Sequence, residues 1–422
     1  MNITLNRPTF ASEVEAPTSK SAAHRVLMAA AFADRPSRIR VSGAGKDIEA
    51  TVRCLAALGA GITEHPAEDG NTRLEVTPLR KVKKSALLDC GESGSTLRFL
   101  VPVAAALGAD ATFIRRGRLP ERPMEPLTTL LRENGVLCTD NPDGSLTVCG
   151  RLRAGDYSIA ANVSSQFITG LLFALSLTEG TSTLTLTGEI ESAPYIDMTV
   201  HALAAFGAAP VRTDDCRRYT LGGKPLRSPG DLYPEGDFSG AAFPLAAGAV
   251  GGHPVTVTGL DLCSTQGDMA ILDLLEKFGA KVIRDKKSGS VTVSPAPLHG
   301  IEIDAKQIPD LVPILAVIAA TASGKTMITG AARLRLKESD RIATTAAMLR
   351  ALGGHVTETE DGLIVEGTSL TTGTVEGAND HRIVMSGAIA SLAAKGPVTL
   401  TDAEAVAKSY PRFFDLIQNP AN

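Results

Sequence analysis

The phrase LAALGAGIT at residues 55–63 decides how this chain is organised, because a phrase of the same type recurs four more times. Each copy reads Leu-x-x-x-Gly and continues into a short β-prone stretch, with the shared glycines 76, 72, 72 and 74 residues apart. The glycines are Gly59, Gly135, Gly207, Gly279 and Gly353. A fixed period predicts a fold that is built from repeated supersecondary units.

Two other features of the sequence repeat with the same period. Segments rich in small apolar residues begin near Lys20, Ser93, Ser164, Phe238, Asp310 and His381. β-Branched runs close on glycine in the phrases IRVSG, FIRRG, LTLTG, VTVTG and MITG, with VTLTD as the sixth. Three registers with one period indicate six copies of one unit.

One unit is predicted to contain helix, strand, helix, glycine, strand, turn and strand. Its first helix is apolar on nearly every side, as in 311–322, so this helix is expected to be buried. The second helix is amphipathic and ends on a glycine that suits a left-handed C-terminal cap. Hairpins are predicted over 281–294 and 356–367. The sequence therefore predicts an α/β (α+β) fold with two domains of three units.

Two segments lie outside this regular pattern. The polar stretch 222–237 is the best candidate for a linker between the domains. The N-terminal strand at residues 2–7 precedes the first unit, and the sixth unit is truncated. We therefore expect the N-terminal strand to complete a sheet of the second domain.

Composition excludes several classes of protein. The 422 residues carry 42 Lys and Arg against 46 Asp and Glu, whereas a general nucleic-acid binder usually has a basic excess. The apolar stretch 311–322 is shorter than the roughly 20 residues that span a bilayer, and the N-terminus lacks the apolar core of a signal peptide. Six cysteines without a CxxC spacing predict neither a zinc site nor a disulfide framework. These features predict a cytoplasmic protein.

The apolar helices are preceded by polar motifs that differ from one unit to the next: TSKSAAHR, CGESGSTLRF, NVSSQF, QIPD and NDHR. Helix N-termini favour anions, so several that converge would form an anion site. Simple N-capping explains Ser164, Asp310 and Asp380 equally well. It does not explain cations such as Lys20 and Arg382, because the helix dipole opposes positive charge at this end.

The segment LRLKESDRIA at 334–343 strengthens the case for an anionic ligand. Lys337 and Arg341 are like charges four residues apart, although Glu338 and Asp340 could simply neutralise them. The cations on equivalent loops and helix starts are Lys20, Arg25, Arg98, Arg122, Lys337, Arg341, Arg382 and Lys408. We therefore expect a cleft between the domains that binds one or two small, multiply anionic molecules. Asp310 and Glu338 are the candidate acid and base.

Nine motifs, in order, resemble the 5-enolpyruvylshikimate-3-phosphate (EPSP) synthase family over essentially the whole chain. They are SKSxxxR, GESGSTLRF, ERP, SSQF, SAPYID, IPD, KESDR, NDHR and AKSYP. The resemblance implies the inside-out, barrel-like enolpyruvyl transferase fold, with three βαβαββ units in each domain. It implies an N-terminal domain at 19–234 that mainly binds shikimate phosphate. The second domain, 1–18 plus 235–422, would contribute to phosphoenolpyruvate binding, with the active site in the interdomain cleft.

The resemblance also supplies the reaction and the residues. The enolpyruvyl group of phosphoenolpyruvate would pass to the 5-hydroxyl of shikimate 3-phosphate, with release of phosphate. The implied catalytic residues are Asp310, Glu338 and Lys20. The implied shikimate 3-phosphate contacts are Lys20, Ser21, Arg25, Ser164, Ser165, Gln166, Ser192, Tyr195, Asp310 and Lys337. The implied phosphoenolpyruvate contacts are Lys20, Gly94, Arg122, Gln166, Arg341, Arg382 and Lys408.

The chain departs from the usual family pattern at four positions, Thr18, Glu92, Ser95 and Arg333. The resemblance implies no cofactor, no metal, no nucleic-acid or membrane partner, and a monomer. It also implies that glyphosate occupies the phosphoenolpyruvate site.

Two other functions explain part of the pattern. The enolpyruvyl transferase that acts on UDP-N-acetylglucosamine shares the fold, but its family carries a reactive cysteine on a loop that here reads FIRRGRLPER, at 113–122. A non-enzymatic scaffold that binds a polyanion explains the repeats, but it would reuse one polar motif rather than vary it. Release of phosphate from the two substrates discriminates among the three functions.

Overall fold

The computed structural model describes residues 1–66 and 71–418, which belong to two compact units. Unit 1 consists of Met1–Ser19 and Glu235–Asn422, and unit 2 of Lys20–Pro234. The six apolar helices begin within two residues of their predicted starts. They are α1 (Lys20–Ala31), α3 (Gly94–Leu107), α5 (Ser165–Ser176), α7 (Phe238–Val250), α9 (Val312–Thr321) and α11 (His381–Ala393).

Unit 2 contains three four-stranded sheets, one for each repeat. The first has the order β15-β4-β6-β5, with β15 (Asp231–Leu232), β4 (Ser37–Val41), β6 (Thr72–Thr77) and β5 (Gly61–Pro66). The second has the order β7-β8-β10-β9, with β7 (Ser85–Asp89), β8 (Asp110–Ile114), β10 (Leu146–Cys149) and β9 (Leu137–Asp140). The third has the order β11-β12-β14-β13, with β11 (Asp156–Ala160), β12 (Thr181–Thr187), β14 (Arg218–Gly222) and β13 (Val211–Arg212).

Unit 1 repeats this plan. One sheet has the order β17-β18-β16-β3, with β17 (Lys281–Asp285), β18 (Ser290–Ser294), β16 (Val255–Thr258) and β3 (Glu13–Glu15). A second has the order β19-β20-β22-β21, with β19 (Glu302–Asp304), β20 (Lys325–Thr329), β22 (Leu363–Glu366) and β21 (His355–Glu358). Both predicted hairpins, β17–β18 and β21–β22, are confirmed.

The truncated sixth repeat is completed by the N-terminus, as predicted. Strand β1 (Ile3–Leu5) pairs antiparallel with β24 (Val398–Leu400), which pairs parallel with β23 (Gly373–Val375). A small sheet joins β2 (Thr9–Phe10) to β25 (Ile417–Gln418). Both ends of the described chain are therefore held in unit 1.

The chain exchanges one strand between its first and fourth repeats. Strand β3 precedes α1 in sequence but pairs with β16 of unit 1, whereas β15 precedes α7 but pairs with β4 of unit 2. The predicted linker at 222–237 contains the boundary between the units, at Pro234 and Glu235, but its residues Asp231–Leu232 form a strand that pairs parallel with β4. Backbone hydrogen bonds of 2.8 Å, from Ser19 N to Glu235 O and from Asp237 N to Pro17 O, tie the two chain segments together.

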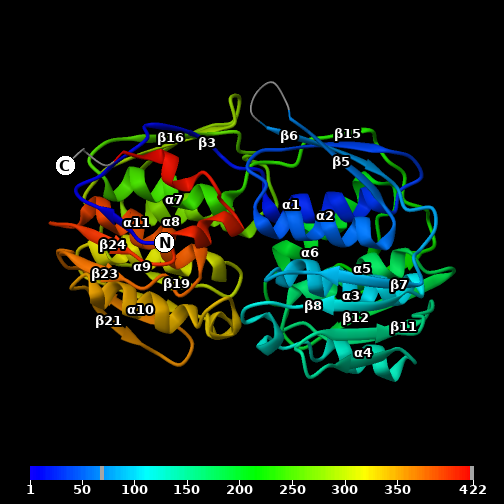
Figure 1. Ribbon diagram of the computed structural model, residues 1–422. Coiled ribbons are helices and arrows are strands. Elements are labelled where there is room, and N and C mark those ends of the chain that lie inside the picture. Colours follow the sequence, from blue (N-terminus) through cyan, green and yellow to red (C-terminus); the bar gives the residue numbers. More distant parts are fainter. Residues whose placement is uncertain (67–70, 419–422) are drawn as a thin grey trace. The chain divides into compact units, whose positions relative to one another are not determined.

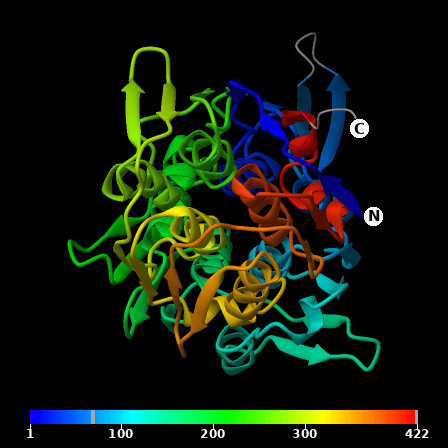
Figure 2. The ribbon, with the colours of Figure 1, turned by 90° about the vertical axis from the view of Figure 1, so that its left-hand side faces the viewer.

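Along the chain, the second helix of each complete repeat follows the repeat's central strand and precedes its hairpin. These helices are α2 (Lys46–Leu58), α4 (Leu127–Glu133), α6 (Ala193–Ala205), α8 (Ile271–Phe278) and α10 (Arg341–Ala351). In unit 1, α7 and α11 lie inside the unit, with β3 and β16 above α7 and β21 below α10 (Figure 1). Turned by 90°, the same unit shows its helices at the centre and the hairpin β17–β18 at its rim (Figure 2).

Each unit has its own core, built around the three apolar helices. In unit 2, α3 and α5 approach closely because Gly170 faces the α3 backbone. A Cβ atom at Gly170 would lie 2.3 Å from the carbonyl oxygen of Arg98, so only glycine fits there. This contact fixes the first turns of α3 and α5 relative to each other.

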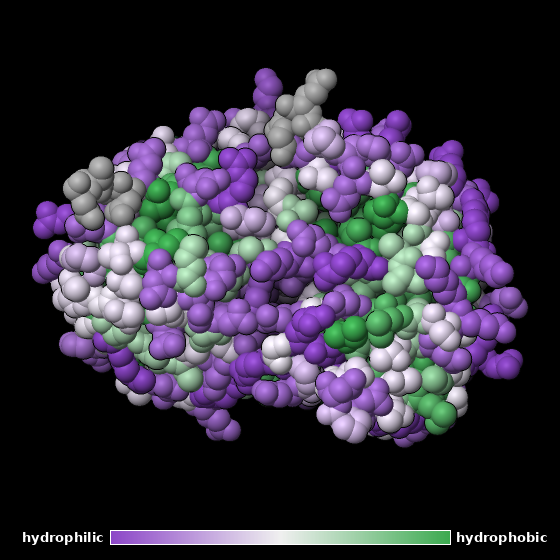
Figure 3. All heavy atoms as spheres, viewed as in Figure 1, coloured by the Kyte–Doolittle hydropathy of each residue, from purple (hydrophilic) through white to green (hydrophobic). Residues whose placement is uncertain are grey.

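Hydrophilic side chains dominate the face of the molecule in Figure 3, and apolar side chains form small separate groups on it. Within residues 1–66 and 71–418, no helix is both long and apolar enough to cross a membrane.

Candidate active site

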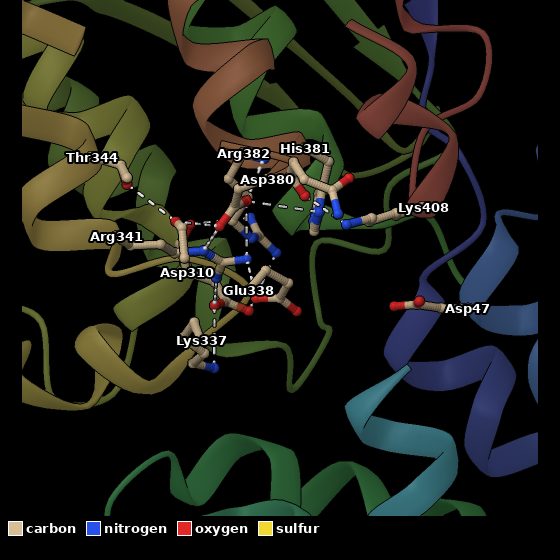
Figure 4. Close-up of polar contacts among 12 residues, drawn as sticks. Asp47, Asp310, Lys337, Glu338, Arg341, Thr344, Asp380, His381, Arg382 and Lys408 are labelled. Carbon is tan, nitrogen blue, oxygen red and sulfur yellow. Dashed lines mark hydrogen bonds and ion pairs between the residues drawn. The ribbon is translucent and has the colours of Figure 1, made fainter. Parts of the chain in front are cut away.

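Three helix starts of unit 1 meet at the guanidinium group of Arg382, the second residue of α11. Its Nη2 donates to Ser239 Oγ near the start of α7 at 2.6 Å. Its Nη1 donates to the backbone oxygen of Asp310 at 3.0 Å, and its Nη2 to Asp310 Oδ2 at 3.2 Å (Figure 4). Asp310 lies in a 3₁₀ turn (Pro309–Leu311) directly before α9. The predicted convergence of unlike helix starts is therefore present within unit 1.

Asp310 is a carboxylate surrounded by cations. Its Oδ1 accepts a hydrogen bond from Arg341 Nη1 at 2.9 Å and lies 3.5 Å from Lys337 Nζ. Burial favours the neutral acid, but Arg382, Lys337 and Arg341 together hold the pKa of Asp310 well below its usual range. Asp310 is therefore ionised in the protein without ligands.

Arg341, the first residue of α10, is buried among three carboxylates. Besides Asp310, its Nη2 donates to Glu338 at 2.6 Å and its Nε to Asp380 Oδ2 at 2.8 Å. Burial disfavours the charged guanidinium, but Asp380, Glu338 and Asp310 raise the pKa of Arg341 above its ordinary value. The three carboxylates therefore keep the Arg341 guanidinium group charged and fixed in position, and they also balance its charge.

Asp380 caps α11 as well as pairing with Arg341. Its side chain accepts from the backbone N–H of Arg382 at 2.9 Å and from Ser339 Oγ at 2.9 Å. Burial raises the pKa of Asp380, but Arg341 more than offsets this, so the pKa is lowered. The N-cap predicted for Asp380 is therefore present, and the same side chain also forms an ion pair with Arg341 that the sequence did not predict.

Lys408 completes the described group of cations in unit 1. It ends a 3₁₀ segment (Ala403–Lys408), and its Nζ donates to the backbone oxygen of Asn379 at 2.5 Å. Asn379 precedes Asp380, so Lys408 lies beside the start of α11.

In unit 2, Arg25 of α1 is a buried cation among neutral acceptors. Its guanidinium group donates to Thr199 Oγ1 at 2.9 Å, to Thr169 Oγ1 at 3.2 Å, and to the backbone oxygens of Ser21 and Tyr195 at 2.7 Å each. It also lies 5.3 Å from the ring centroid of Phe99. Burial lowers the pKa of Arg25 to about 10, so the group stays charged at neutral pH.

Lys20, the first residue of α1, pairs with Asp47 at 3.0 Å. Asp47 belongs to the first turn of α2, where the sequence did not single it out. Behind this pair, His24 Nδ1 lies 2.7 Å from Thr51 Oγ1, which lies 2.8 Å from Thr96 Oγ1 of α3. This chain of polar contacts holds α1, α2 and α3 in a fixed arrangement.

Gln166 joins the starts of α5 and α3. Its Oε1 accepts from Arg98 Nη1 at 2.7 Å, and its Nε2 donates to Ser95 Oγ at 2.9 Å. Ser164 caps α5 by accepting from the backbone N–H of Gln166 at 3.3 Å, and Ser165 is the first residue of that helix. Arg98, which was not among the predicted contacts, therefore orients a residue that was.

Gly94 and Arg122 touch each other. A Cβ atom at Gly94 would lie 2.8 Å from Arg122 Nη1, so the guanidinium group packs directly on the first turn of α3. The two residues belong to separate motifs of the sequence, so this contact is seen only in the folded protein.

Ser192 and Tyr195 lie at the start of α6, next to Arg25. Ser192 has φ of 55°, a left-handed conformation that costs a non-glycine residue of the order of 1 kcal/mol. Tyr195 contributes its backbone oxygen to Arg25.

The predicted site residues form groups within each unit. The group in unit 1 is Asp310, Lys337, Glu338, Arg341, Arg382 and Lys408. The predicted residues in unit 2 are Lys20, Ser21, Arg25, Gly94, Arg122, Ser164, Ser165, Gln166, Ser192 and Tyr195. Sequence reasoning missed Ser239 and Asp47, because hydroxyl and carboxyl side chains at helix starts resemble ordinary caps. It also missed Thr199, which lies in the middle of α6 and belongs to no polar motif.

Two of the atypical positions have contacts of their own. Arg333 Nη2 donates to the backbone oxygen of Lys306 at 3.0 Å. The carboxyl group of Glu92 packs against Gly117, where a Cβ atom would lie 2.8 Å from Glu92 Cδ. In the described part of the chain, no group of three or more His, Cys, Asp and Glu side chains is arranged to hold a metal ion.

Solved structures with the same architecture are enolpyruvyl transferases. EPSP synthase from Acinetobacter baumannii has a TM-score of 0.80 and 27% sequence identity, covering 98% of this chain and 97% of its own. The enolpyruvyl transferase NikO from Streptomyces tendae has a TM-score of 0.74 at 21% identity, which relates the two by fold alone. The fold class is therefore that of the enolpyruvyl transferases, as predicted.

Sequence comparison assigns the family. The profile of the EPSP synthase (3-phosphoshikimate 1-carboxyvinyltransferase) family matches residues 7–417. The 3-phosphoshikimate 1-carboxyvinyltransferase of Clostridium acetobutylicum is 40% identical over 417 residues, 98% of this chain and 95% of the relative. That of Methanocorpusculum labreanum is 38% identical over 421 residues, 98% and 97% of the two chains. The chain belongs to the EPSP synthase family, and it is an enzyme of enolpyruvyl transfer to shikimate 3-phosphate.

Proposed function

We propose that unit 2 holds shikimate 3-phosphate and that the unit 1 cluster, together with Lys20, Gly94, Arg122 and Gln166, holds phosphoenolpyruvate. The observation that carries this proposal is the contrast between two buried arginines. Arg25 has only neutral acceptors in its hydrogen bonds, whereas Arg341 is surrounded by carboxylates.

Arg25 is suited to the phosphate group of shikimate 3-phosphate. A buried cation without a counter-charge is costly, and a phosphate dianion would supply that charge. The hydroxyl groups of Ser164 and Ser165, at the start of α5, can donate to the same ligand, where the helix dipole also favours an anion. The remaining proposed contacts of shikimate 3-phosphate are Lys20, Ser21, Gln166, Ser192 and Tyr195 of unit 2, together with Asp310 and Lys337 of unit 1.

The unit 1 cluster is suited to the carboxylate and phosphate of phosphoenolpyruvate. Arg341 and Arg382 present planar guanidinium groups that bind such anions through paired hydrogen bonds. Lys408 adds a third positive charge beside the start of α11. An incoming anion competes with Asp310 and Glu338 for these cations, which frees the two carboxyl groups for proton transfer.

The chemistry follows from the weak electrophilicity of an enol ester. Glu338 pairs with Arg341 in the empty site, so it must take up a proton from solvent after the ligand displaces it. It then donates this proton to the methylene carbon of phosphoenolpyruvate, while Asp310 removes the proton from the 5-hydroxyl of shikimate 3-phosphate and the hydroxyl oxygen bonds to the adjacent carbon. The product is a tetrahedral ketal phosphate. Glu338, now a carboxylate, takes a proton back from the new methyl group as the carbon–oxygen bond to phosphate breaks, which releases phosphate and restores the double bond. Correct placement of two bound reactants can supply roughly 7–11 kcal/mol toward the barrier.

Asp310 becomes a better base when the site is filled. Its pKa is depressed by Arg382, Lys337 and Arg341, and an anion that pairs with these cations weakens the depression. The base is thus held ionised in the empty site and gains proton affinity with the ligands bound. Lys20, whose ammonium group pairs with Asp47, would neutralise negative charge on the transferred group.

The test is steady-state release of phosphate from phosphoenolpyruvate. Release should require shikimate 3-phosphate, and UDP-N-acetylglucosamine should not replace it. Asp310→Asn and Glu338→Gln should each lower kcat by about 10²–10⁴-fold, the usual contribution of general acid–base catalysis. Arg284→Ala, which removes an exposed ion pair in unit 1, is the control and should keep the parental rate. Normal turnover by both carboxyl variants would contradict the assigned roles.

We further propose that the enzyme is a cytoplasmic monomer. Light scattering coupled to size-exclusion chromatography should give a mass near 43.9 kDa. A mass of twice this value would contradict the monomer. Cell fractionation that recovers the enzyme with periplasmic or secreted markers would contradict the location.

A further inference from the structure

Asp268 is a buried carboxyl group that the proposed mechanism does not use. It lies in the 3₁₀ turn Gly267–Ala270, which packs against α7 of unit 1. Its side chain is inaccessible to solvent, and neither carboxyl oxygen forms a hydrogen bond of normal geometry with any residue in 1–66 or 71–418. An ionised carboxylate in such a place is costly, so a proton or a nearby cation must compensate it.

The groups that face Asp268 come from three neighbouring elements. Arg382 of α11 favours the ionised form of Asp268, and so does the hydroxyl of Ser239 near the start of α7. Asp310 and Asp237, the N-cap of α7, oppose ionisation. Burial and the charge of Asp310 prevail and raise the pKa of Asp268 to about 6.

Ser239 and Arg382 relate Asp268 to the site through their electrostatic effect on it. Arg382 Nη2 donates to Ser239 Oγ at 2.6 Å and to Asp310 Oδ2 at 3.2 Å, and its positive charge also favours the ionised form of Asp268. Asp310 is held ionised by three cations, whereas Asp268 faces Arg382 alone among them. Of the two acids, Asp268 is therefore the one that gains a proton more readily.

We propose that Asp268 is a positioning residue for Arg382, and that it takes up a proton from solvent when an anion binds to Arg382. This inference rests on the proposed binding of phosphoenolpyruvate at Arg382. A ligand anion neutralises the positive charge that favours ionised Asp268, and it adds negative charge near Asp310. Protonation of Asp268 removes the excess negative charge while Asp310 stays ionised for catalysis.

The sign of the effect follows from linkage. If the ligand raises the pKa of Asp268 above its value of about 6 in the empty site, binding takes up a proton at pH values between the two pKa values. Affinity for the anion should therefore weaken as pH rises above about 6, by at most about tenfold per pH unit. An asparagine at this position mimics the protonated acid and should remove this dependence.

The experiment compares the parent enzyme with Asp268→Asn in steady-state phosphate release from pH 6 to 8.5. The KM for phosphoenolpyruvate should rise with pH more steeply in the parent than in the variant, while the two kcat values stay within about threefold. The titration of the phosphate of phosphoenolpyruvate is common to both proteins and cancels in the comparison. Asp285→Asn, an exposed position on β17, is the matched control and should keep the parental profile.

Calorimetric titration of phosphoenolpyruvate into the parent, in buffers of different ionisation enthalpy at pH 7.5, gives the proton uptake directly. We expect the parent to take up more protons than Asp268→Asn. Should the variant fail to fold, Ser239→Ala, which removes the hydroxyl that favours ionised Asp268, should lower the uptake in the same way. Equal uptake, or the parental KM profile in Asp268→Asn, would overturn the inference. If the parent releases no phosphate with both substrates present, the proposed function itself has failed.

Discussion

Two buried arginines carry their charge in opposite ways. Arg341 lies among Asp310, Glu338 and Asp380, so its charge is balanced before any ligand arrives. Arg25 donates to hydroxyl and carbonyl oxygens, and these neutral groups leave its charge uncompensated. At the scale of single residues, an anion that binds Arg25 would supply a missing counter-charge. An anion that binds Arg341 would instead replace one of the carboxylates that already pair with it.

Removal of Arg25 should therefore weaken binding of shikimate 3-phosphate. A hydrogen bond to a charged group contributes about 1.5–3 kcal/mol, so Arg25→Ala should raise the Kd by roughly 10- to 150-fold. Isothermal titration measures this Kd. Because Arg25 also ties α1 to α5 and α6, thermal unfolding must show that the variant is folded. Unchanged affinity in a folded Arg25→Ala protein would remove Arg25 from the phosphate site.

Gly94→Ala tests the contact between the first turn of α3 and Arg122. The new methyl group would lie 2.8 Å from Arg122 Nη1, so the guanidinium group must shift. We expect the shift to crowd glyphosate, the longer ligand, more than phosphoenolpyruvate. The inhibition constant of glyphosate should rise by a larger factor than the KM for phosphoenolpyruvate, as measured at matched substrate saturation. Equal factors, or noncompetitive inhibition against phosphoenolpyruvate, would refute this placement.

At the scale of elements, the residues at the start of α11 both cap the helix and belong to the proposed site. Asp380 caps α11 and pairs with Arg341, while Arg382, two residues later, reaches Asp310 and Ser239. A cation at a helix N-terminus opposes the dipole, and the neighbouring carboxylates offset that cost. The start of α11 is therefore both a structural and a binding element.

Asp380→Ala should destabilise the protein strongly. Breaking a buried ion pair costs about 3–5 kcal/mol, whereas Asp380→Asn can keep the cap and should lose about 0.5–2 kcal/mol less. Asp340→Ala removes the N-cap of α10 and an ion pair between Asp340 and the partly exposed Arg335. Because an exposed ion pair contributes little, this variant should lose only the stability that the cap provides. Urea unfolding at pH 7 measures the free energy of unfolding of all three variants.

The stability that Asp380 contributes should also depend on pH. Since folding lowers the pKa of Asp380, this stability is fully present above the pKa that the group has in the unfolded chain, and it is lost as the pH falls through the pKa in the folded protein. Parental stability in Asp380→Ala would contradict this role.

The periodic part of this architecture is visible in the sequence, and the pairing of side chains is not. The six apolar helices and the glycines that follow the amphipathic helices lie where the period predicts them. Two of the carboxylates that accept hydrogen bonds from Arg341, those of Asp310 and Asp380, lie 31 and 39 residues away in the sequence. No local sequence pattern predicts these two contacts. The sequence does not predict strand β15, because its two residues lie in a polar stretch without a β-prone run, and pairing with the distant strand β4 stabilises it.

At the scale of the molecule, the two units share one plan of repeats and differ in electrostatics. Unit 1 places Asp310, Lys337, Glu338, Arg341 and Arg382 in one network of ion pairs, whereas the hydrogen bonds of Arg25 in unit 2 go to neutral acceptors. The order of the repeats is preserved, and specificity lies in the polar motifs before the helices.

In the proposed mechanism, lysine and arginine side chains supply the positive charge that binding of phosphoenolpyruvate and release of its phosphate require, so no metal ion is needed. Activity should therefore survive dialysis against EDTA, with phosphate release within error of the untreated enzyme. Complete loss of activity that a divalent ion restores would contradict this expectation.

The central claim is that the reaction passes through protonation of the phosphoenolpyruvate methylene carbon followed by loss of a proton from the resulting methyl group. The measurement is mass spectrometry of the enolpyruvyl product formed in D₂O. We expect deuterium at the methylene carbon of a substantial fraction of the product, and none in phosphoenolpyruvate incubated without shikimate 3-phosphate. Product that forms with release of phosphate but carries no deuterium at that carbon would contradict the mechanism.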